Sequence, residues 1–573
     1  MDDITTLLEM VLRYHEETKH RFDRYARALG YLDWANQPDP FRRYRGAALV
    51  RLPVLGPDEE PLSPPYDRLF VPGAVPGAPV TIRTISRLFE YALALSAWKQ
   101  AGGTRWALRS NPSSGNLHPT EGYLLIGAIR GLASSPALYH YAPREHGLER
   151  RADCPEELHA RLMQDFPPRA FLVALTSVHW RETWKYGERG FRYCQHDAGH
   201  AIGTVRIAAA TLGWSALLLD GLADETVEAL LGLNRGEDFA GAERECPECV
   251  LVVWPTVSAG DWEAGARRAL PLYLDSDVVP ELAAQRWYGK ANRLSTDDPV
   301  PWEIIDRVTE ASRKAGVERR VLDFAVPSRP PGAVPPVDER PSAGRIIHRR
   351  RSLLACDGKT SISAERFYRM LARVMPRSDL PVMQRPMPWD AIPWDPAIHF
   401  GLFVHRVSGL DPGLYLLARD PEKAGKLRRS THERFAWTAP PGCPPGLPLY
   451  LLETGDARRL AAQLSCHQDI AGDGAFSLGM IADFQENLFA RGPWFYRRLF
   501  WESGAIGQVL YLEAEAAGVR ATGIGCFFDD PVHQAFGFKD FAFQSLYHFT
   551  VGGAVDDPRL TTLPPYGRGK LFA

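Results

Sequence analysis

The feature that most constrains the fold is an internal repeat. At an ungapped offset of 305 residues, segment 187–233 aligns with 492–538, and nine of the 47 aligned positions are identical. Both copies show the same order of features: a long apolar stretch typical of a buried helix, a glycine, an apolar strand, an acidic turn and a short helix. The 573-residue chain is therefore predicted to contain two copies of one structural unit.

A proline-rich segment separates the two copies. Six of the fifteen residues in 327–341 are proline, a composition that favours an extended linker over packed structure. We therefore predict an N-terminal domain over 1–260, a connecting segment over 261–341 that ends in this linker, and a C-terminal domain over 342–573. Two large domains also suit the length of the chain.

Helices and strands alternate in both parts of the sequence. Helices are predicted at 200–211 and 505–517, where small and aliphatic residues surround most of the circumference. The predicted strands are 122–129, 171–176, 215–219, 249–254, 397–404, 521–528 and 543–551. This order predicts two α+β domains, each with a sheet flanked by helices.

Bulk composition narrows the classes of partner. Hydrophobic residues make up 45% and charged residues 24% of the chain, which is typical of a globular protein, and the formal net charge of −2 provides no positive field for nucleic acid or anionic lipid. The acidic start lacks a secretory signal, and no apolar run approaches the ~20 residues of a membrane span. Eight irregularly spaced cysteines suit a reducing compartment. We expect a cytoplasmic protein without nucleic-acid or membrane partners.

Two motifs offer polar contacts to a ligand. The first is the loop Pro112, Ser113, Ser114, Gly115 and Asn116. Its short donors and its glycine suit a planar polar ligand, but a plain turn explains the loop equally well. The second is Arg349, Arg350, Arg351 and Ser352. A guanidinium group can donate two parallel hydrogen bonds to phosphate oxygens, so the motif predicts a phosphate site. The alternative interpretation is a solvated basic run.

A third motif is Gly523, Ile524 and Gly525, at the end of a predicted strand. The missing side chains would let backbone N–H groups approach a ring edge, and a tight strand corner is the alternative. No metal site is expected. The Cys246–Cys249 pair has no second pair nearby, and His196 and His200 lack the glutamate of a zinc-protease motif.

These motifs resemble a known family. The segment that starts at Tyr14, the loop 111–121 and the run 185–200 resemble the SagB-type flavin dehydrogenases of the nitroreductase superfamily. The second half resembles the same superfamily through 349–352, 502–508 and 521–530. The resemblance covers nearly the whole chain as two tandem domains.

The resemblance implies mainly antiparallel sheets and an intramolecular pseudo-dimer, with FMN in a cleft lined by both domains. By analogy, the arginine clamp holds the FMN phosphate, the strand-end glycines meet the isoalloxazine near N5, and the serine- and asparagine-containing loop comes from the other domain. The pair Lys185 and Tyr186 matches residues implicated in catalysis in these dehydrogenases.

Each domain retains only one half of a site. The clamp and the strand-end glycines lie in the second domain, where 375–389 contains no recognisable serine and asparagine loop. In the first domain, Leu218, Leu219 and Asp220 align with the glycine motif, and no clamp is visible. We therefore predict one complete cleft and one FMN per chain. Leu354 stands where family members often have a basic residue near the flavin.

The leading functional hypothesis is an FMN-dependent dehydrogenase. The resemblance implies oxidation of an azoline-type heterocycle on a peptide or small molecule, with hydride transfer to flavin N5, proton removal by Lys185 or Tyr186, and dioxygen as an acceptor that could reoxidise the flavin. One alternative is NAD(P)H-dependent reduction of nitro or quinone compounds. Another is a degenerate, non-catalytic binding scaffold.

Overall fold

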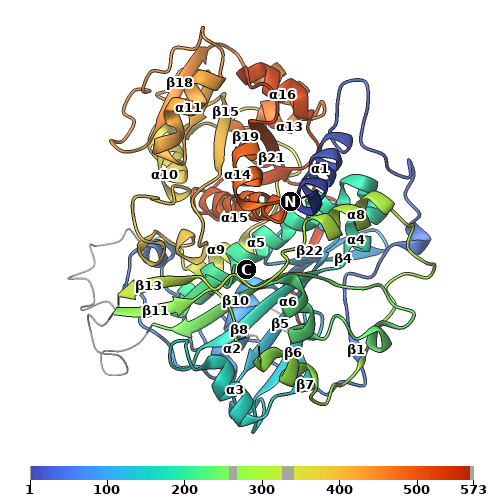
Figure 1. Ribbon diagram of the computed structural model, residues 1–573. Helices are drawn as coiled ribbons and strands as arrows, with labels where there is room; N and C mark the ends of the chain where they lie inside the picture. Colours follow the sequence, from blue (N-terminus) through green and yellow to red (C-terminus); the bar gives the residue numbers. More distant parts are fainter. Residues whose placement is uncertain (1, 257–266, 276, 326–340, 568–573) are drawn as a thin grey trace.

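The chain forms two halves, each built on one large sheet, with long helices between them (Figure 1). The computed structural model describes residues 2–256, 267–275, 277–325 and 341–567. The predicted linker 327–341 therefore lies outside the described residues, except for Pro341. Within the described ranges, no helix combines the length and the apolar run that crossing a bilayer requires.

Both large sheets are antiparallel, and six strands of one follow the same order as the six strands of the other. The N-terminal sheet has the order β2 (Leu49–Arg51), β7 (Gly147–Asp153), β6 (Ala137–Ala142), β5 (Thr120–Ile126), β8 (Phe171–Ser177), β10 (Cys246–Pro255) and β9 (Trp214–Leu218). The C-terminal sheet has the order β18 (Leu449–Thr454), β17 (Gly413–Leu417), β15 (Ile398–Val404), β19 (Phe476–Asp483), β21 (Phe543–Gly552) and β20 (Arg520–Ile524). The predicted α+β class, with mainly antiparallel sheets flanked by helices, is confirmed.

The repeated segments form the same elements in both halves. Helix α5 (Gly190–Thr211) leads through a glycine to β9 and then to α6 (Asp224–Leu231). Helix α15 (Phe495–Ala516) leads in the same way to β20 and α16 (Asp529–Phe536). The two linking glycines, Gly213 and Gly518, have φ angles of 64° and 76°, a left-handed conformation that glycine adopts most readily after a helix.

Two predicted strands are too long, and one of them, 122–129, continues past Ile126, where β5 ends. The sequence predicts a strand over 521–528, but β20 ends at Ile524. Beyond that point the backbone bonds to other segments: the Gly525 carbonyl accepts a hydrogen bond from Arg189 Nη2 (3.1 Å), and Phe528 N donates to the Leu464 carbonyl (2.8 Å). These tertiary contacts draw the apolar residues out of the sheet.

Helices α5 and α15 pack against each other through glycines. A Cβ atom on Gly199 would lie 2.3 Å from the Trp501 carbonyl oxygen, and one on Gly504 would lie 2.2 Å from the His196 carbonyl oxygen. The 305-residue offset relates each residue of the first contact to its counterpart in the second. Such reciprocal contacts are typical of an interface with approximate two-fold symmetry.

Two buried ion pairs repeat this reciprocity. Arg192 Nη1 lies 2.9 Å from Asp529 Oδ1, and Arg497 Nη2 lies 2.5 Å from Asp224 Oδ2. The same offset relates the two arginines and the two aspartates, and all four side chains are buried. An apolar core that includes residues of both central helices continues across the contact.

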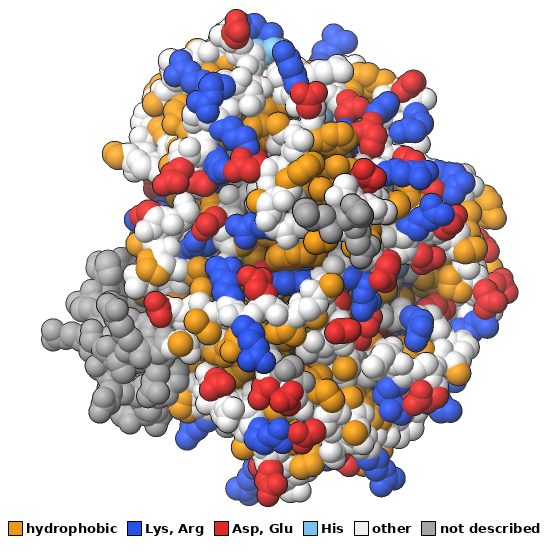
Figure 2. All heavy atoms as spheres, viewed as in Figure 1, with side chains coloured by type: hydrophobic (Ala, Val, Ile, Leu, Met, Phe, Trp, Pro, Cys, Tyr) orange, Lys and Arg blue, Asp and Glu red, His pale blue; other side chains and the backbone are white. Residues whose placement is uncertain are grey.

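Helix α1 (Asp2–Glu17) and strand β22 (Thr561–Leu563) each contact the half of the molecule to which they do not belong in sequence. The side chain of His15, in α1, hydrogen-bonds Tyr496 Oη (3.2 Å) and Gln544 Oε1 (3.1 Å) of the C-terminal half. Conversely, β22 pairs antiparallel with β3 (Leu95–Ala101) of the N-terminal half. The surface over both halves mixes acidic and basic side chains on the face that Figure 2 shows.

Candidate functional site

The loop that contains Ser113 to Asn116 has a fixed conformation. It follows β4 (Thr104–Arg109), and both Gly115 (φ 58°) and Asn116 (φ 60°) are left-handed. Asn116 Nδ2 donates to the Ala107 carbonyl (2.8 Å), and Ser113 Oγ accepts from His118 N (2.8 Å). These bonds hold the loop in place before any ligand binds.

Asp197 of α5 lies against this loop. The backbone N–H and the hydroxyl of Ser114 each donate to Asp197 Oδ1 at 3.0 Å. Burial raises the pKa of Asp197 to about 7, although the hydrogen bonds from Ser113 and Ser114 act in the opposite direction. The motif around Asp197 contributes to the family resemblance, but sequence reasoning did not identify its carboxyl as a site residue.

The predicted catalytic pair lies beside the loop. Helix α4 (His179–Tyr186) ends at the pair, and a Cβ atom on Gly115 would lie 2.6 Å from Tyr186 Oη and 3.3 Å from Lys185 Nζ. Burial raises the pKa of Tyr186 well above its usual value, and the nearby Glu182 carboxyl raises it further. No ion pair to Lys185 Nζ occurs among the described residues, so this nitrogen is available to a ligand.

The residues of the arginine motif differ in their exposure to solvent. It starts at the end of α9 (Ala343–Arg349), and Arg349 is exposed, whereas Arg350 is buried. Arg350 Nη2 donates to the Arg109 carbonyl (3.0 Å), and its guanidinium lies over the Tyr511 ring. Arg350 therefore joins the C-terminal half to the strand that leads into the serine loop, and it does not line the adjoining cavity.

The strand-end glycines adjoin the clamp through Tyr511. Tyr511 Oη lies 3.2 Å from Ser352 Oγ and accepts from Gly523 N at 3.0 Å. A Cβ atom on Gly523 would lie 1.8 Å from Tyr547 Oη, so no larger residue fits there. The Ile524 side chain is buried in the outer core of the C-terminal half. Only the backbone of Ile524 is therefore available to the cleft.

Tyr193 connects the two half-sites. Its ring centroid lies 4.4 Å from that of Tyr186, and a Cβ atom on Gly525 would lie 2.1 Å from Tyr193 Cε1. Arg189, just after the catalytic pair, donates to the Gly525 carbonyl. Through Tyr193, the structure therefore places the predicted catalytic pair of one half close to the strand-end glycines of the other.

A cavity of about 730 Å³ opens beside the clamp. Its lining includes Arg349, Arg351, Ser352, Leu354, Glu515, Lys99 and Arg520. Burial lowers the pKa of Arg351 to about 10, and the charge of Arg350 lowers it further. The pKa of Lys99 is lowered by burial and then by the charges of Arg351 and Arg520. Cations that oppose one another in this way favour an anionic ligand.

Lys99 and Arg520 were not identified from the sequence. Lys99 lies in β3 and Arg520 begins β20, so only the fold brings them to the clamp. Arg520 stands three residues before Gly523, and that proximity is the one signal that could have identified it. Leu354, 69% exposed, lines the same cavity. Lys99 and Arg520 therefore add two basic side chains to the cavity that Leu354 lines, and Arg520 pairs there with Asp556 (2.5 Å).

The counterpart cleft is organised differently. In place of Gly525 it has Asp220, whose backbone carbonyl accepts a hydrogen bond from Lys314 Nζ (2.5 Å). Lys314 also lies 4.1 Å from the Trp494 ring centroid. Arg206, the counterpart of Tyr511, pairs with Asp390 (2.6 Å). A pocket of about 450 Å³ remains there, and part of the segment that connects the halves lines it.

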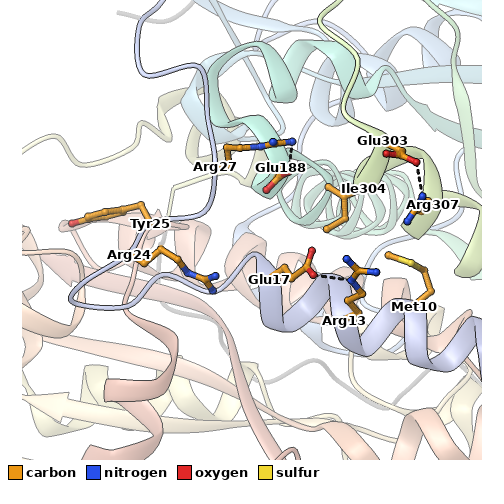
Figure 3. Close-up of a pocket in the computed structure, with 10 residues that line it drawn as sticks. All are labelled: Met10, Arg13, Glu17, Arg24, Tyr25, Arg27, Glu188, Glu303, Ile304 and Arg307. Carbon is orange, nitrogen blue, oxygen red and sulfur yellow. Dashed lines mark hydrogen bonds and ion pairs between the residues drawn. The ribbon is translucent and has the colours of Figure 1, made fainter.

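A third pocket, also about 450 Å³, lies between α1 and α8 (Glu303–Ala311), as Figure 3 shows. Its lining contains three Arg–Glu pairs: Arg13–Glu17 (2.7 Å), Arg27–Glu188 (2.8 Å) and Arg307–Glu303 (2.5 Å). The linings of this pocket and of the cavity at the clamp each contain four Lys or Arg residues and three Asp or Glu residues. Across the described part of the chain, no cluster of three His, Cys, Asp or Glu residues is arranged to hold a metal ion.

Comparisons with known proteins identify the N-terminal half. Residues 77–242 match the Nitroreductase family. A protein of Methanocaldococcus jannaschii named "Putative nitroreductase" is 26% identical over 163 residues, which cover 27% of this chain and 77% of that protein. Residues 77–242 are a nitroreductase-family domain. This family supports a flavin-type oxidoreductase in general.

Solved structures extend the likeness in fold. A "putative nitroreductase" from Anabaena variabilis aligns with a TM-score of 0.65 at 20% identity, covering 95% of this chain and 99% of that one. A nitroreductase of Exiguobacterium sibiricum, solved in complex with FMN, aligns over 37% of this chain with a TM-score of 0.22 at 14% identity. The Anabaena structure shows that the nitroreductase-like fold extends over both halves.

Proposed function

We propose that this protein is an FMN-dependent dehydrogenase that oxidises an azoline-type heterocycle on a peptide or a related small molecule. The proposal rests on one observation above all. Lys185 and Tyr186 lie against the serine loop at Gly115, and Tyr193 links Tyr186 to Gly525 of the other half. The nitroreductase-family domain supports the flavin, and the sequence resemblance supports the substrate class.

The residues beside this cleft fit FMN. Arg349, Arg351 and Ser352, together with Lys99 and Arg520, provide donors and positive charge for a phosphate. The cavity volume of about 730 Å³ falls within the usual range for cofactor sites. Gly523 and Gly525 lie outside the lining of this cavity and pack against Tyr547 and Tyr193. FMN bound here would supply a hydride acceptor at N5.

The chain's own residues would remove the substrate proton and orient the substrate. We assign proton removal from the substrate to Lys185, whose Nζ has no ion-pair partner among the described residues. Tyr186 keeps its proton because burial raises its pKa, so it can donate a hydrogen bond that orients the substrate. Asp197 would hold the serine loop through Ser114. Dioxygen is the proposed acceptor that restores the oxidised cofactor.

Flavin content tests this proposal. The purified full-length protein should be yellow and release one FMN per chain on denaturation. Under anaerobic conditions, an azoline-containing peptide should bleach the flavin, whereas NADH and NADPH should not. Bleaching by NAD(P)H alone would instead favour a nitro or quinone reductase. A colourless protein that ignores added FMN would favour a non-catalytic scaffold, and a ratio near two would contradict the single cleft.

A further inference from the structure

Two cysteines and a histidine from distant segments meet just beyond the strand-end glycines. Cys526 follows Gly525 directly, and Cys466, two residues after α12 (Arg458–Leu464), lies close enough to share a hydrogen bond with it. Phe528 N donates to the Leu464 carbonyl (2.8 Å), and Gln468 Nε2 donates to the Cys526 carbonyl (3.1 Å). Both cysteines are partly exposed and both are free thiols. A small reagent can therefore reach this pair.

His20 acts as a hydrogen-bond donor to this pair. Its Nδ1 accepts from Ala26 N at 2.9 Å, so the neutral ring carries its proton on Nε2. Burial lowers the pKa of His20 and keeps the ring neutral. The remaining N–H then donates to the Cys526 sulfur, with which His20 shares a hydrogen bond. A donor in this position stabilises the thiolate over the thiol.

Cys466 and Arg189 strengthen the same effect. The Cys466 thiol donates a hydrogen bond to Cys526, and this bond is the largest contribution that lowers the pKa of Cys526, against the opposing effect of burial. Arg189 adds positive charge, since its guanidinium is bonded to the Gly525 carbonyl one residue away. By contrast, burial raises the pKa of Cys443, another partly exposed cysteine.

We propose that Cys526 and Cys466 form a hydroperoxide-reactive thiol pair beside the cleft, with Cys526 as the nucleophile and Cys466 as the resolving thiol. The Cys526 thiolate attacks one peroxide oxygen, so that an S–O bond forms, the O–O bond breaks and the leaving oxygen takes a proton. The Cys466 sulfur then attacks the Cys526 sulfur, forming the disulfide and releasing water. Two electrons pass from the thiols to the hydroperoxide.

This site does not depend on the proposed dehydrogenase activity. Cys526 adjoins Gly525, which packs against Tyr193. Burial raises the pKa of Tyr193, and the thiolate charge of Cys526 raises it further. Oxidation removes that charge next to the cleft. The chemistry of the pair can nevertheless be measured on protein with or without bound cofactor, so failure of either proposal leaves the other to be judged by its own experiment.

The first test is alkylation of the reduced, full-length protein with iodoacetamide at pH 7, followed by peptide mass spectrometry. An ordinary thiol is only a few per cent ionised at this pH, so we expect Cys526 to react at least about tenfold faster than the internal control Cys443. This comparison needs no variant and is made on one folded molecule. Equal or slower reaction of Cys526 would overturn the proposal.

The second test treats the reduced protein with hydrogen peroxide and maps the products. We expect a disulfide that joins the peptides of Cys466 and Cys526. In Cys466→Ser, the resolving thiol is missing, so dimedone should trap a sulfenic acid at Cys526. Cys443→Ser should behave like the parent. A disulfide to any other cysteine, or an unmodified Cys526 in both proteins, would contradict the pairing.

Discussion

The two clefts between the halves differ, although the central contacts made by α5 and α15 recur on both sides. The glycine contact at Gly199 and Gly504 and the pairs Arg192–Asp529 and Arg497–Asp224 are reciprocal. The cleft residues are not reciprocal. Each reciprocal contact uses the same positions of both copies. A cleft instead uses different positions from each copy. If only one cleft binds a cofactor, residues of the other cleft can diverge while these central contacts stay reciprocal.

Removing the proposed base should produce the largest difference between the clefts. Lys185→Ala should reduce the rate of flavin reduction by an azoline peptide about 10²–10⁴-fold, the usual contribution of a positioned base, and leave FMN bound. Arg491→Ala changes the residue that aligns with Tyr186 in the other cleft and should keep the parental rate. Rapid-reaction absorbance measures this step. Parental rates in Lys185→Ala would show that the lysine is structural.

Replacing the two buried aspartates should destabilise the protein to different extents, because one of them has more arginine partners. Asp529 accepts from both Arg189 and Arg192, whereas among the described residues Asp224 forms an ion pair only with Arg497. Breaking a buried pair typically costs 3–5 kcal/mol. We expect urea unfolding to show a loss of about this size for Asp224→Asn and a larger loss for Asp529→Asn. A larger loss for Asp224→Asn would contradict this ranking.

The pH dependence should separate Asp197 from its counterpart Glu502. The folded pKa of Asp197, about 7, exceeds its ordinary value of 3.8. Its contribution to stability is therefore complete below about pH 4 and is lost as the pH rises through 7, by up to about 4 kcal/mol. Asp197→Asn should lack this loss when unfolding is followed from pH 4 to 8.

Glu502 is the matched control for this experiment. It is ion-paired with buried Arg419 and accepts from Ala397 N (3.0 Å). Glu502→Gln leaves the Arg419 charge uncompensated, so it should destabilise the protein by about 3–5 kcal/mol. If Asp197→Asn retains the full parental pH dependence between 4 and 7, the Asp197 carboxyl does not titrate as described.

Loss of one clamp arginine should have the smallest effect of these changes. Arg351→Ala should weaken FMN binding about ten- to a hundredfold, because a charge-assisted hydrogen bond contributes roughly 1.5–3 kcal/mol. Arg320→Ala, in the lining of the other pocket, should bind FMN like the parent. Equilibrium fluorescence titration of the apoprotein measures both affinities. Equal binding by the two variants would exclude Arg351 from the phosphate site.

The sequence was sufficient for the fold class but not for the charge around the clamp. Apolar runs and the repeat predict both sheets, since burial of those residues leaves few other arrangements. The end of β20 was wrong because a side chain 336 positions away, Arg189, bonds the Gly525 carbonyl. Lys99 reaches the cavity through its place in β3, so no local pattern marks it. Arg350 belongs to the predicted motif, yet its burial became clear only from the packing.

Because β22 pairs with β3, strand β3 is synthesised long before its partner. Leu95 N donates to Tyr566 Oη, 471 positions further along the chain. At about 5–20 residues per second, a ribosome takes about 25–95 seconds to add that stretch. During this interval the outer edge of β3 has no strand partner, and an unpaired edge invites pairing with another chain. Residues 560 and 562–565 also line the clamp cavity, so a nascent chain cannot enclose a ligand there until these residues have been synthesised.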